Sequence, residues 1–260
     1  MATRSFFTDG TAYEQLMGRW SRSAGEVFLD WLALPKDLSW LDVGCGTGAF
    51  TELLLDRCAP RHVHAIDPAE DQMAFARTRP GMAGVTFRVG DAQSLPFPDR
   101  SFDAVAMALV INFVPDAAKA VAEMRRVTRP GGTAGTYMWD WPGRRTIQQP
   151  LIDGLEALNV EVPTSTGQGH SGMDALRRFF EGAGFEEVET RAIDIEVSYA
   201  SFDDYWSSQT GLANPVVQAV RKMSPADVER LKTSLRATLS RRDRRVAYRA
   251  RANAVKGRAG

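Results

Sequence analysis

Short apolar runs alternate with longer stretches of helical periodicity along the first 140 residues of the chain. Runs with the composition of buried strands lie at 39–43, 62–67, 85–89, 102–107 and between the turn at 130–132 and residue 139. Stretches with apolar positions at helical spacing lie between them, at 50–58, 69–79 and 116–127. Strands and helices that alternate in this way form βαβ units. The pattern therefore predicts an α/β fold, with a doubly wound, mostly parallel sheet that has helices on both faces.

The segments that flank this alternation are expected to be helical, apart from two further strands near the end of the chain. Helices are predicted at 11–33, 146–159, 171–183 and 201–240. Residues 188–197 alternate like a strand, and 246–255 alternate arginine with alanine, as expected of a charged strand at the edge of a sheet. Residues 198–245 are therefore predicted to be an insertion between the last two strands that covers the mouth of the ligand site.

A single domain is expected over residues 1–260, and it has three parts. Residues 1–38 are predicted to form an N-terminal helical cap, residues 39–140 a cofactor-binding core, and residues 198–245 the helical insertion. Ligands of open α/β sheets bind beyond the carboxyl ends of the strands. Functional residues are therefore expected in the loops that follow the strands, at 43–49, 67–73, 89–99, 107–115 and 139–146.

Composition argues against several classes of function. Lysine plus arginine and aspartate plus glutamate number 32 each, so no nucleic-acid partner is expected, despite the basic stretch at 241–245. The longest apolar run, Ala104 to Ile111, is shorter than the ~20 residues of a membrane span, and the N-terminus lacks the apolar core of a secretion signal. These features predict a cytoplasmic protein without a membrane span. Cys45 and Cys58 make neither a disulfide framework nor a metal site, so no metal is expected.

A glycine-rich turn, Leu41-Asp-Val-Gly-Cys-Gly-Thr-Gly48, joins the first predicted strand to the helix after it. Its three glycines remove three Cβ atoms from one turn, so backbone can approach a ligand and adopt positive φ. The helix that follows offers unpaired N–H groups in its first turn. A tight structural turn is the alternative, and Gly44, Gly46 and Ala49 also satisfy the dinucleotide pattern G-x-G-x-x-A. The turn indicates a nucleotide-type cofactor without specifying which one.

Acidic residues follow the second and third predicted strands. Asp67 ends the second strand, where a carboxylate can accept two hydrogen bonds from a ribose diol, each worth roughly 1.5–3 kcal/mol. Its alternative role is to cap the helix that begins after Pro68. Asp91 is positioned to accept a hydrogen bond from an adenine amine, with the backbone of Ala92 beside the ring, and a surface loop residue is the alternative there. Together the two acids favour a cofactor that contains adenosine.

Six motifs in this order resemble those of one enzyme family. Besides the glycine turn they are Ile66-Asp-Pro68, Gly90-Asp-Ala92, Leu95-Pro-Phe-Pro98, Ser101-Phe-Asp103 and Arg125-Arg-Val-Thr-Arg-Pro-Gly-Gly132. The set resembles the class I methyltransferases that use S-adenosylmethionine (SAM), and more narrowly the bacterial group similar to the ubiquinone and menaquinone biosynthesis methyltransferases. The resemblance implies a Rossmann-like sheet of seven strands with the last strand antiparallel. It also implies methyl transfer to a small-molecule acceptor, with S-adenosylhomocysteine (SAH) as the product.

The resemblance also assigns parts of the cofactor to individual loops. The turn at 44–48 is expected to contact the methionine part, Asp67 the ribose, and Asp91 with Ala92 the adenine. Residues 107–109 are expected to line the methyl-donor side.

One residue of the predicted cap is expected to meet the SAM carboxylate, and the candidates are Arg19, Ser21 and Arg22. The full set of predicted cofactor residues is Arg22, Asp42, Gly44, Cys45, Gly46, Asp67, Pro68, Met73, Asp91, Ala92, Gln93, Met107 and Leu109.

Methyl transfer is a displacement at a sulfonium carbon, so the protein mainly aligns the acceptor with the methyl group. A base is needed only when the acceptor must lose a proton to become nucleophilic. Asp140, at the end of the fifth predicted strand, is the catalytic candidate, and a turn acid before Trp141-Pro-Gly143 is the alternative. Many related enzymes carry a histidine pair after the fourth strand, where this chain has Asn112-Phe113. Chemistry that depends on such a histidine is therefore not expected.

Aromatic residues fall in the segments expected to border the acceptor pocket, namely Trp139, Trp141, Tyr205 and Trp206. They can form an apolar wall or attract the sulfonium through cation–π contact. The alternative is that they pack the insertion against the sheet.

Two other functions remain open at this stage. An NAD-dependent oxidoreductase shares the glycine pattern but leaves the Asp91 motif unexplained. A SAM-binding module that does not turn over is the second alternative, because no residue here is a required catalytic group. A monomer or a homodimer is expected.

Overall fold

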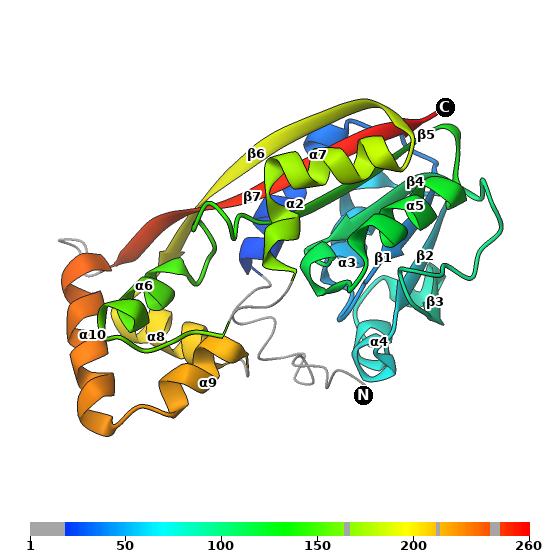
Figure 1. Ribbon diagram of the computed structural model, residues 1–260. Coiled ribbons are helices and arrows are strands. Elements are labelled where there is room, and N and C mark those ends of the chain that lie inside the picture. Colours follow the sequence, from blue (N-terminus) through cyan, green and yellow to red (C-terminus); the bar gives the residue numbers. More distant parts are fainter. Residues whose placement is uncertain (1–18, 164–166, 212–213, 240–244) are drawn as a thin grey trace.

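A computed structural model describes residues 19–163, 167–211, 214–239 and 245–260. Its strands form one sheet of seven in the order β3-β2-β1-β4-β5-β7-β6 (Figure 1). The parallel strands are β1 (Ser39–Val43), β2 (His62–Asp67), β3 (Val85–Val89), β4 (Phe102–Ala108) and β5 (Thr128–Trp139). The last strand, β7 (Val246–Ala259), runs antiparallel to both β5 and β6 (Phe185–Tyr199). The predicted Rossmann-like sheet with an antiparallel last strand is therefore confirmed.

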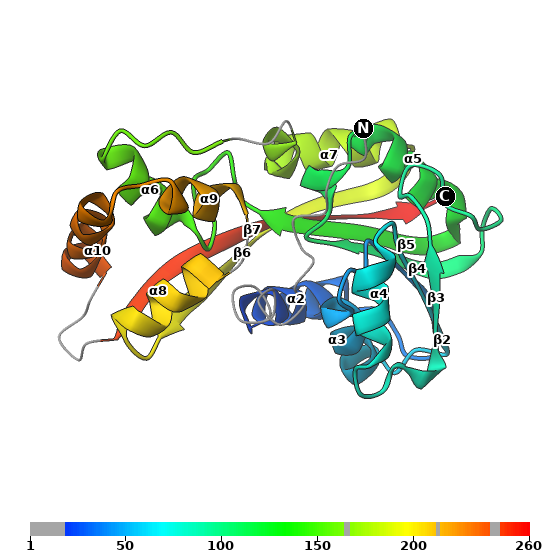
Figure 2. The same cartoon turned by 90° about the horizontal axis from the view of Figure 1, so that it is seen from below.

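Helices cover both faces of the sheet, as the βαβ pattern predicts. In Figure 2, α2 (Arg19–Leu32), α3 (Ala49–Cys58) and α4 (Glu70–Arg77) lie on one face, and α5 (Ala117–Val127) and α7 (Met173–Gly182) lie on the other. The periodicity of α5 explains its orientation, since its buried residues recur every three or four positions. The central strand β1 is buried along its whole length, as is typical of parallel strands covered on both faces.

The remaining helices form a group beside the end of the sheet, where the long β6–β7 pair extends past the other strands (Figure 1). This group contains α6 (Gln149–Ala157), α8 (Phe202–Gly211), α9 (Pro215–Arg221) and α10 (Pro225–Leu239). The last three follow one another in the chain between β6 and β7. Instead of one helical stretch at 201–240 there are three helices, because Pro215 and Pro225 each begin a new one.

The prediction that the last strand lies at the edge of the sheet is wrong. β7 is hydrogen-bonded on both sides, between β5 and β6, and β6 is the edge strand. The alternation of arginine and alanine has another physical basis: Ala250, Ala252 and Ala254 are fully buried between the two neighbouring strands. The arginines lie on the opposite side, where Arg251 forms an ion pair with Asp194 of β6 at 2.7 Å.

Element boundaries differ from the predictions by a few residues. α2 begins at Arg19, and the predicted helical residues before it lie outside the described part of the chain, as do 241–244 of the basic stretch. The glycine pair at 131–132 does not precede β5 but lies within it. No helix among the described residues has the length and apolar composition needed to cross a membrane. Over the same described ranges, no cluster of side chains suited to a metal ion is present.

Candidate cofactor and acceptor site

The glycine turn adopts the left-handed backbone that its composition predicts. Gly44 and Gly46 have φ values of 77° and 50°. A Cβ atom at Gly44 would lie 2.5 Å from a methyl carbon of Val110, so the turn passes directly against the segment that follows β4. The backbone N–H groups of Gly44 and Cys45 both donate to the carbonyl oxygen of Ile66, at 2.7 and 3.0 Å. The loops after β1, β2 and β4 therefore meet at one place, at the carboxyl ends of the strands.

Asp67 connects this turn to the end of β2. One carboxylate oxygen accepts a hydrogen bond from the N–H of Gly46 at 2.9 Å, and the other accepts one from the N–H of Ala69 at 2.8 Å. Burial raises the pKa of Asp67, while these two hydrogen bonds lower it. The Ala69 contact resembles the predicted capping role, although α4 itself begins at Glu70. Each carboxylate oxygen has a second lone pair, so Asp67 keeps the capacity to accept the hydrogen bonds of a ribose diol beside these two contacts.

Asp42 is a fully buried carboxyl group beneath the turn. One oxygen accepts a hydrogen bond from the Thr51 hydroxyl at 2.6 Å, and the other has no hydrogen-bond partner among the described residues. Burial, and then the nearby charge of Asp67, raise the pKa of Asp42 to about 7, against the lowering effect of Thr51. A buried carboxyl oxygen without a partner is costly, so this position suits a ligand that brings a positive charge or an N–H donor.

Three further predicted cofactor residues lie in different surroundings, namely Met73, Cys45 and Pro68. Met73 is fully buried and packs with Cys45 and Ala65 in a small cluster beneath β2. Burial raises the pKa of the Cys45 thiol well above its usual range. Pro68 is exposed at the start of the next loop. These contacts give Met73 and Cys45 the role of core residues.

The loop after β3 holds the residues predicted at the adenine. Asp91 is exposed, and its carboxylate accepts hydrogen bonds from the backbone N–H of Gln93 at 2.8 Å and from the side-chain amide of Gln93. Ala92, half-buried, packs against the main core. The side-chain oxygen of Gln93 accepts from the backbone N–H of Asp116 at 3.1 Å. The hydrogen bonds between Asp91 and Gln93 thus fix the loop. An adenine amine that binds Asp91 would share the carboxylate oxygens with Gln93.

The segment after β4 carries a local backbone strain. Leu109 has a φ of 60°, which is rare for a residue other than glycine, and its N–H donates to the carbonyl oxygen of Tyr137 at 2.9 Å. Met107 is fully buried in the core, while Leu109 is 7% exposed. Of the two residues predicted on the methyl-donor side, Leu109 is the one next to Val110 and the glycine turn.

Asn112 is a residue of this segment that the sequence analysis did not select. It lies in the short helix η3 (Ile111–Phe113), is 5% exposed, and neither atom of its side-chain amide has a partner among the described residues. The ring of His170 reaches this segment from elsewhere in the chain, with Nδ1 3.3 Å from the carbonyl oxygen of Ile111. The sequence signal for this residue is that Asn112 stands where many related enzymes carry a histidine.

The three candidates for the SAM carboxylate differ in their surroundings. The side chain of Arg19 lies outside the described part of the chain. Arg22 is exposed and forms ion pairs with Asp56 at 3.0 Å and Glu26 at 3.5 Å, on the surface shared by α2 and α3. Ser21 is 7% exposed, and its hydroxyl has no partner among the described residues. Ser21 is therefore the better candidate of the two that can be compared.

Asp140, the predicted catalytic residue, has the geometry of the alternative role. Its side chain is 8% exposed and accepts a hydrogen bond from the N–H of Gly143 at 2.9 Å. This closes the turn after β5, and the carboxylate lies so close to Gly143 that a Cβ atom there would collide with it. This contact is the one expected of a turn acid, and the catalytic role of Asp140 stays a prediction.

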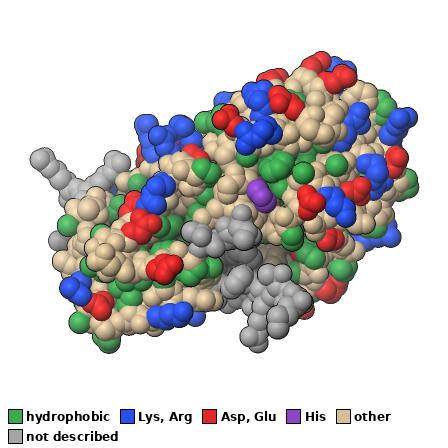
Figure 3. Space-filling view, in the orientation of Figure 1, with side chains coloured by type: hydrophobic (Ala, Val, Ile, Leu, Met, Phe, Trp, Pro, Cys, Tyr) green, Lys and Arg blue, Asp and Glu red, His purple; other side chains and the backbone are tan. Residues whose placement is uncertain are grey.

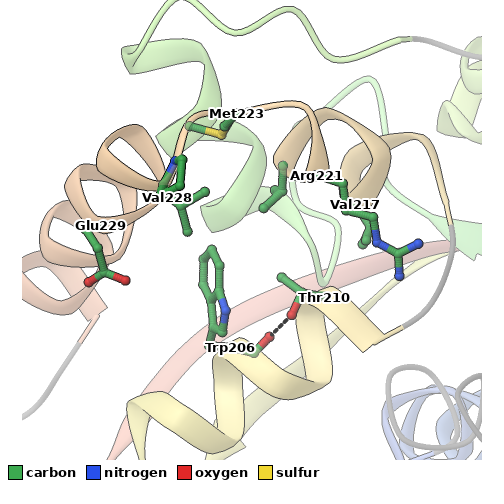
Figure 4. Close-up of a pocket in the computed structure, with 9 residues that line it drawn as sticks. Trp206, Thr210, Val217, Arg221, Met223, Val228 and Glu229 are labelled. Carbon is green, nitrogen blue, oxygen red and sulfur yellow. Dashed lines mark hydrogen bonds between the residues drawn. The ribbon is translucent and has the colours of Figure 1, made fainter.

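Trp206 and other residues of α8, α9 and α10 line an open pocket of about 460 Å³ (Figure 4). Trp206 extends from α8 into this space, opposite Met223 and Val228. The indole is stacked on Phe202 with an angle of 19° between the rings, and the Lys232 ammonium lies 5.2 Å from its centre. These contacts place Trp206 among the helices of the insertion, and its predicted position at the acceptor pocket stays a prediction. Trp139 is buried, and its indole N–H has no partner among the described residues.

The surface seen in Figure 3 carries interspersed acidic and basic side chains, with no large area of one sign. This distribution agrees with the equal numbers of the two charges in the sequence.

Comparison with known proteins gives consistent results. A family profile described as a methyltransferase domain matches residues 41–135. A demethylmenaquinone methyltransferase of Geobacillus stearothermophilus is 31% identical over 175 residues, which cover 61% of this chain and 75% of the relative. The corresponding enzyme of Staphylococcus aureus (strain JH9) is 32% identical over 176 residues, covering 62% and 73%.

Solved structures share the fold at lower identity. A putative methyltransferase from Bacillus halodurans C-125 has a TM-score of 0.60 and 19% identity, covering 90% of this chain and 98% of that one. Phosphoethanolamine N-methyltransferase 2 of Haemonchus contortus, in complex with SAM, has a TM-score of 0.57 and 16% identity, covering 95% and 56%.

Proposed function

Because this chain belongs to the class I SAM-dependent methyltransferases, we propose that it transfers the methyl group of SAM to a small-molecule acceptor. The observation that carries the proposal is the Asp67 carboxylate, which is hydrogen-bonded to the glycine turn at the point where the loops after β1, β2 and β4 meet. The relatives named as demethylmenaquinone methyltransferases support an acceptor that is a small molecule.

The residues present fit the cofactor. The buried oxygen of Asp42 that lacks a partner suits the ammonium group of SAM, and the second lone pairs of Asp67 suit the ribose hydroxyls. Ser21 is proposed for the carboxylate, and Asp91 with Ala92 for the adenine. When bound, SAM supplies a methyl group that is already activated on a sulfonium centre.

The protein itself contributes mainly alignment. The strained backbone at Leu109 and the close contact between Gly44 and Val110 fix the segment after β4 against the turn. Holding two reactants in line removes much of the entropic barrier of a displacement. The proposal assigns no base, since a displacement at the sulfonium carbon needs one only when the acceptor must lose a proton. The helices α8–α10 are proposed to bound the acceptor side, and the protein to act in the cytoplasm as a monomer or homodimer without a nucleic-acid partner.

The experiment that tests the proposal is release of SAH by the purified protein with a panel of hydroxylated and aminated small molecules. SAH release that depends on one of these acceptors is the expected result. If SAM binds but none of them raises SAH release above the background, a SAM-binding module without turnover accounts for the chain better.

A further inference from the structure

The three helices of the insertion, α8, α9 and α10, share a pocket with mostly apolar walls (Figure 4). Its volume of about 460 Å³ is within the range of small-ligand sites, and it is open to solvent. The apolar part of the lining is formed by Trp206, Val217, Val220, Met223, Pro225 and Val228. None of these residues belongs to the loops after β1 to β5, so the pocket is separate from the predicted cofactor loops.

Trp206 contributes the largest side chain of the lining, and contacts within the insertion hold its indole in place. The ring is stacked on Phe202, and the Lys232 ammonium lies 5.2 Å from its centre. In Figure 4 the indole points from α8 toward Val228 of α10. Met223 also lines the space, and its flexible side chain can adapt to the shape of a ligand. These side chains offer a fixed aromatic surface and an adaptable wall to an apolar chain.

Two of the three polar residues in the lining are already engaged. The Thr210 hydroxyl donates its proton to the backbone oxygen of Trp206 at 2.7 Å, so it offers a ligand no donor. The carboxylate of Glu229 is paired with the Lys232 ammonium at 2.9 Å, and this hydrogen bond lowers the pKa of Glu229. Glu229 therefore stays ionised, and its charge is balanced from within α10.

The third polar residue is Arg221, which ends α9 and is exposed. The two carboxylates of the neighbouring α10 are both paired, Asp227 with Arg230 and Glu229 with Lys232. Arg221 itself has no ion pair within the described part of the chain. A guanidinium can bind a carboxylate through two parallel N–H donors. The lining thus combines an apolar surface with one positive charge that has no counter-charge.

We propose that this pocket is a second binding site, apart from the methyl-transfer site, and that its ligand is an amphiphilic carboxylate. The guanidinium of Arg221 pairs with the carboxylate, and the apolar chain of the ligand lies against Trp206 and Val228. Charge complementarity selects this class, because a cationic amphiphile would place its charge beside Arg221. Since Arg221 is exposed, its ion pair is expected to strengthen binding by a factor of about five.

Three probes with the same chain length and different charge test the inference: octanoate, 1-octanol and octylammonium. Their binding is measured by calorimetry at pH 7, below the concentrations at which they form micelles, with and without SAH. Octanoate is expected to bind at least fivefold more tightly than octylammonium. Its affinity is expected to be the same in the presence and absence of SAH, because the two sites are separate.

A matched pair of variants tests the role of Arg221. Arg221→Met is expected to weaken octanoate binding about fivefold and to leave 1-octanol binding unchanged, because only the carboxylate uses the guanidinium. Lys222→Met removes the same charge at the next position, which is exposed and outside the lining, and it should match the wild type with both probes. Because both side chains are exposed, neither variant is expected to unfold the protein.

A further variant tests the position of the site. Val228→Trp fills the pocket, so it is expected to weaken the binding of both octanoate and 1-octanol at least tenfold. SAH affinity is expected to stay unchanged in this variant, and its melting temperature shows that the fold persists.

Several results would overturn the inference. They are octanoate binding no tighter than that of octylammonium, no octanoate binding, equal losses in Arg221→Met and Lys222→Met, or unchanged octanoate binding in Val228→Trp. Displacement of octanoate by SAH would also overturn it, because the probe would then occupy the cofactor site. Failure of SAH to bind contradicts only the proposed function, since the octanoate titrations do not depend on SAH.

Discussion

The carboxylate of Asp67 accepts a hydrogen bond from the backbone N–H of Gly46 at 2.9 Å, across 21 residues of sequence. This contact joins the end of β2 to the turn after β1, so the residue proposed for the ribose also sets the position of the turn proposed for the methionine part. Because the two roles share one side chain, changes at Asp67 should affect the whole cofactor and not only its ribose.

Replacing Asp67 with alanine is expected to weaken SAM binding at least tenfold, because both the ribose acceptor and the Gly46 contact are lost. One charge-assisted hydrogen bond, at roughly 1.5–3 kcal/mol, is enough for this effect. Calorimetry measures the affinity, and the melting temperature shows that the fold persists. Asp71→Ala, at an exposed position on α4, is the control. Equal affinities in the two variants would refute the ribose assignment.

Gly46→Val is expected to abolish SAM binding. Its φ of 50° disfavours a β-branched residue, and a Cβ atom there would lie 2.8 Å from the side-chain oxygen of Gln72. Gly81→Val is the matched control, since Gly81 also has a positive φ of 79° but nothing within 4 Å of the added atom. If backbone strain at a positive φ were the only cause, the two variants would lose SAM affinity to a similar extent. The proposed site predicts a loss only at Gly46.

Asp42 is expected to make the free energy of unfolding depend on pH between about 4 and 7. Its pKa in the folded protein is about 7, above the ordinary 3.8, so the folded state holds a proton that the unfolded chain releases. Stability therefore falls as pH rises through this window, by on the order of 4 kcal/mol at most. His64 contributes to the free energy of unfolding in the opposite direction. Burial lowers the pKa of its imidazole, so its contribution to stability rises as the pH rises.

Comparison with Asp42→Asn isolates the effect of Asp42. Urea unfolding at pH 5 and pH 8 should show a smaller fall in the variant than in the wild type, and higher stability of the variant at pH 8. Wild-type SAM affinity should rise over the same range as Asp42 ionises. The same pH dependence in both proteins would show that the Asp42 carboxyl group is not the titrating group.

Ala254→Lys is expected to lower the free energy of unfolding by at least ~3 kcal/mol, because it places a charge at a fully buried position between β5 and β6. Arg249→Ala, at an exposed position of the same strand, should stay within about 0.5 kcal/mol of the wild type. Chemical denaturation measures both. Near-equal stabilities would show that the face of β7 that carries Ala254 is not buried.

Much of the sheet could be predicted because its strands have local signals. The limits of β1, β2 and β3 match the predicted strands. For β1, which is buried along its whole length, the signal is the apolar composition of a parallel strand covered on both faces. The position of β7 had no such signal. Its alanines fit an edge strand as well as a crowded interior one, and strand order depends on pairing between distant segments.

In the candidate site, too, the residues of short motifs could be predicted, whereas contacts between residues far apart in the sequence could not. The glycine turn and the acid at the end of β2 follow from motifs whose parts are close in sequence. Arg19, Ser21 and Arg22 could not be separated as contacts for the SAM carboxylate, because the partner that holds Arg22, Asp56, is 34 residues away and carries no local signal. The Trp20–Tyr199 hydrogen bond, between residues 179 apart, joins α2 to β6 and has no sequence pattern at all.

The central claim is tested most directly by calorimetric titration of the purified protein with SAM, SAH and NAD. The account predicts micromolar binding of SAM and SAH and no binding of NAD. Binding of NAD without SAM or SAH would contradict it.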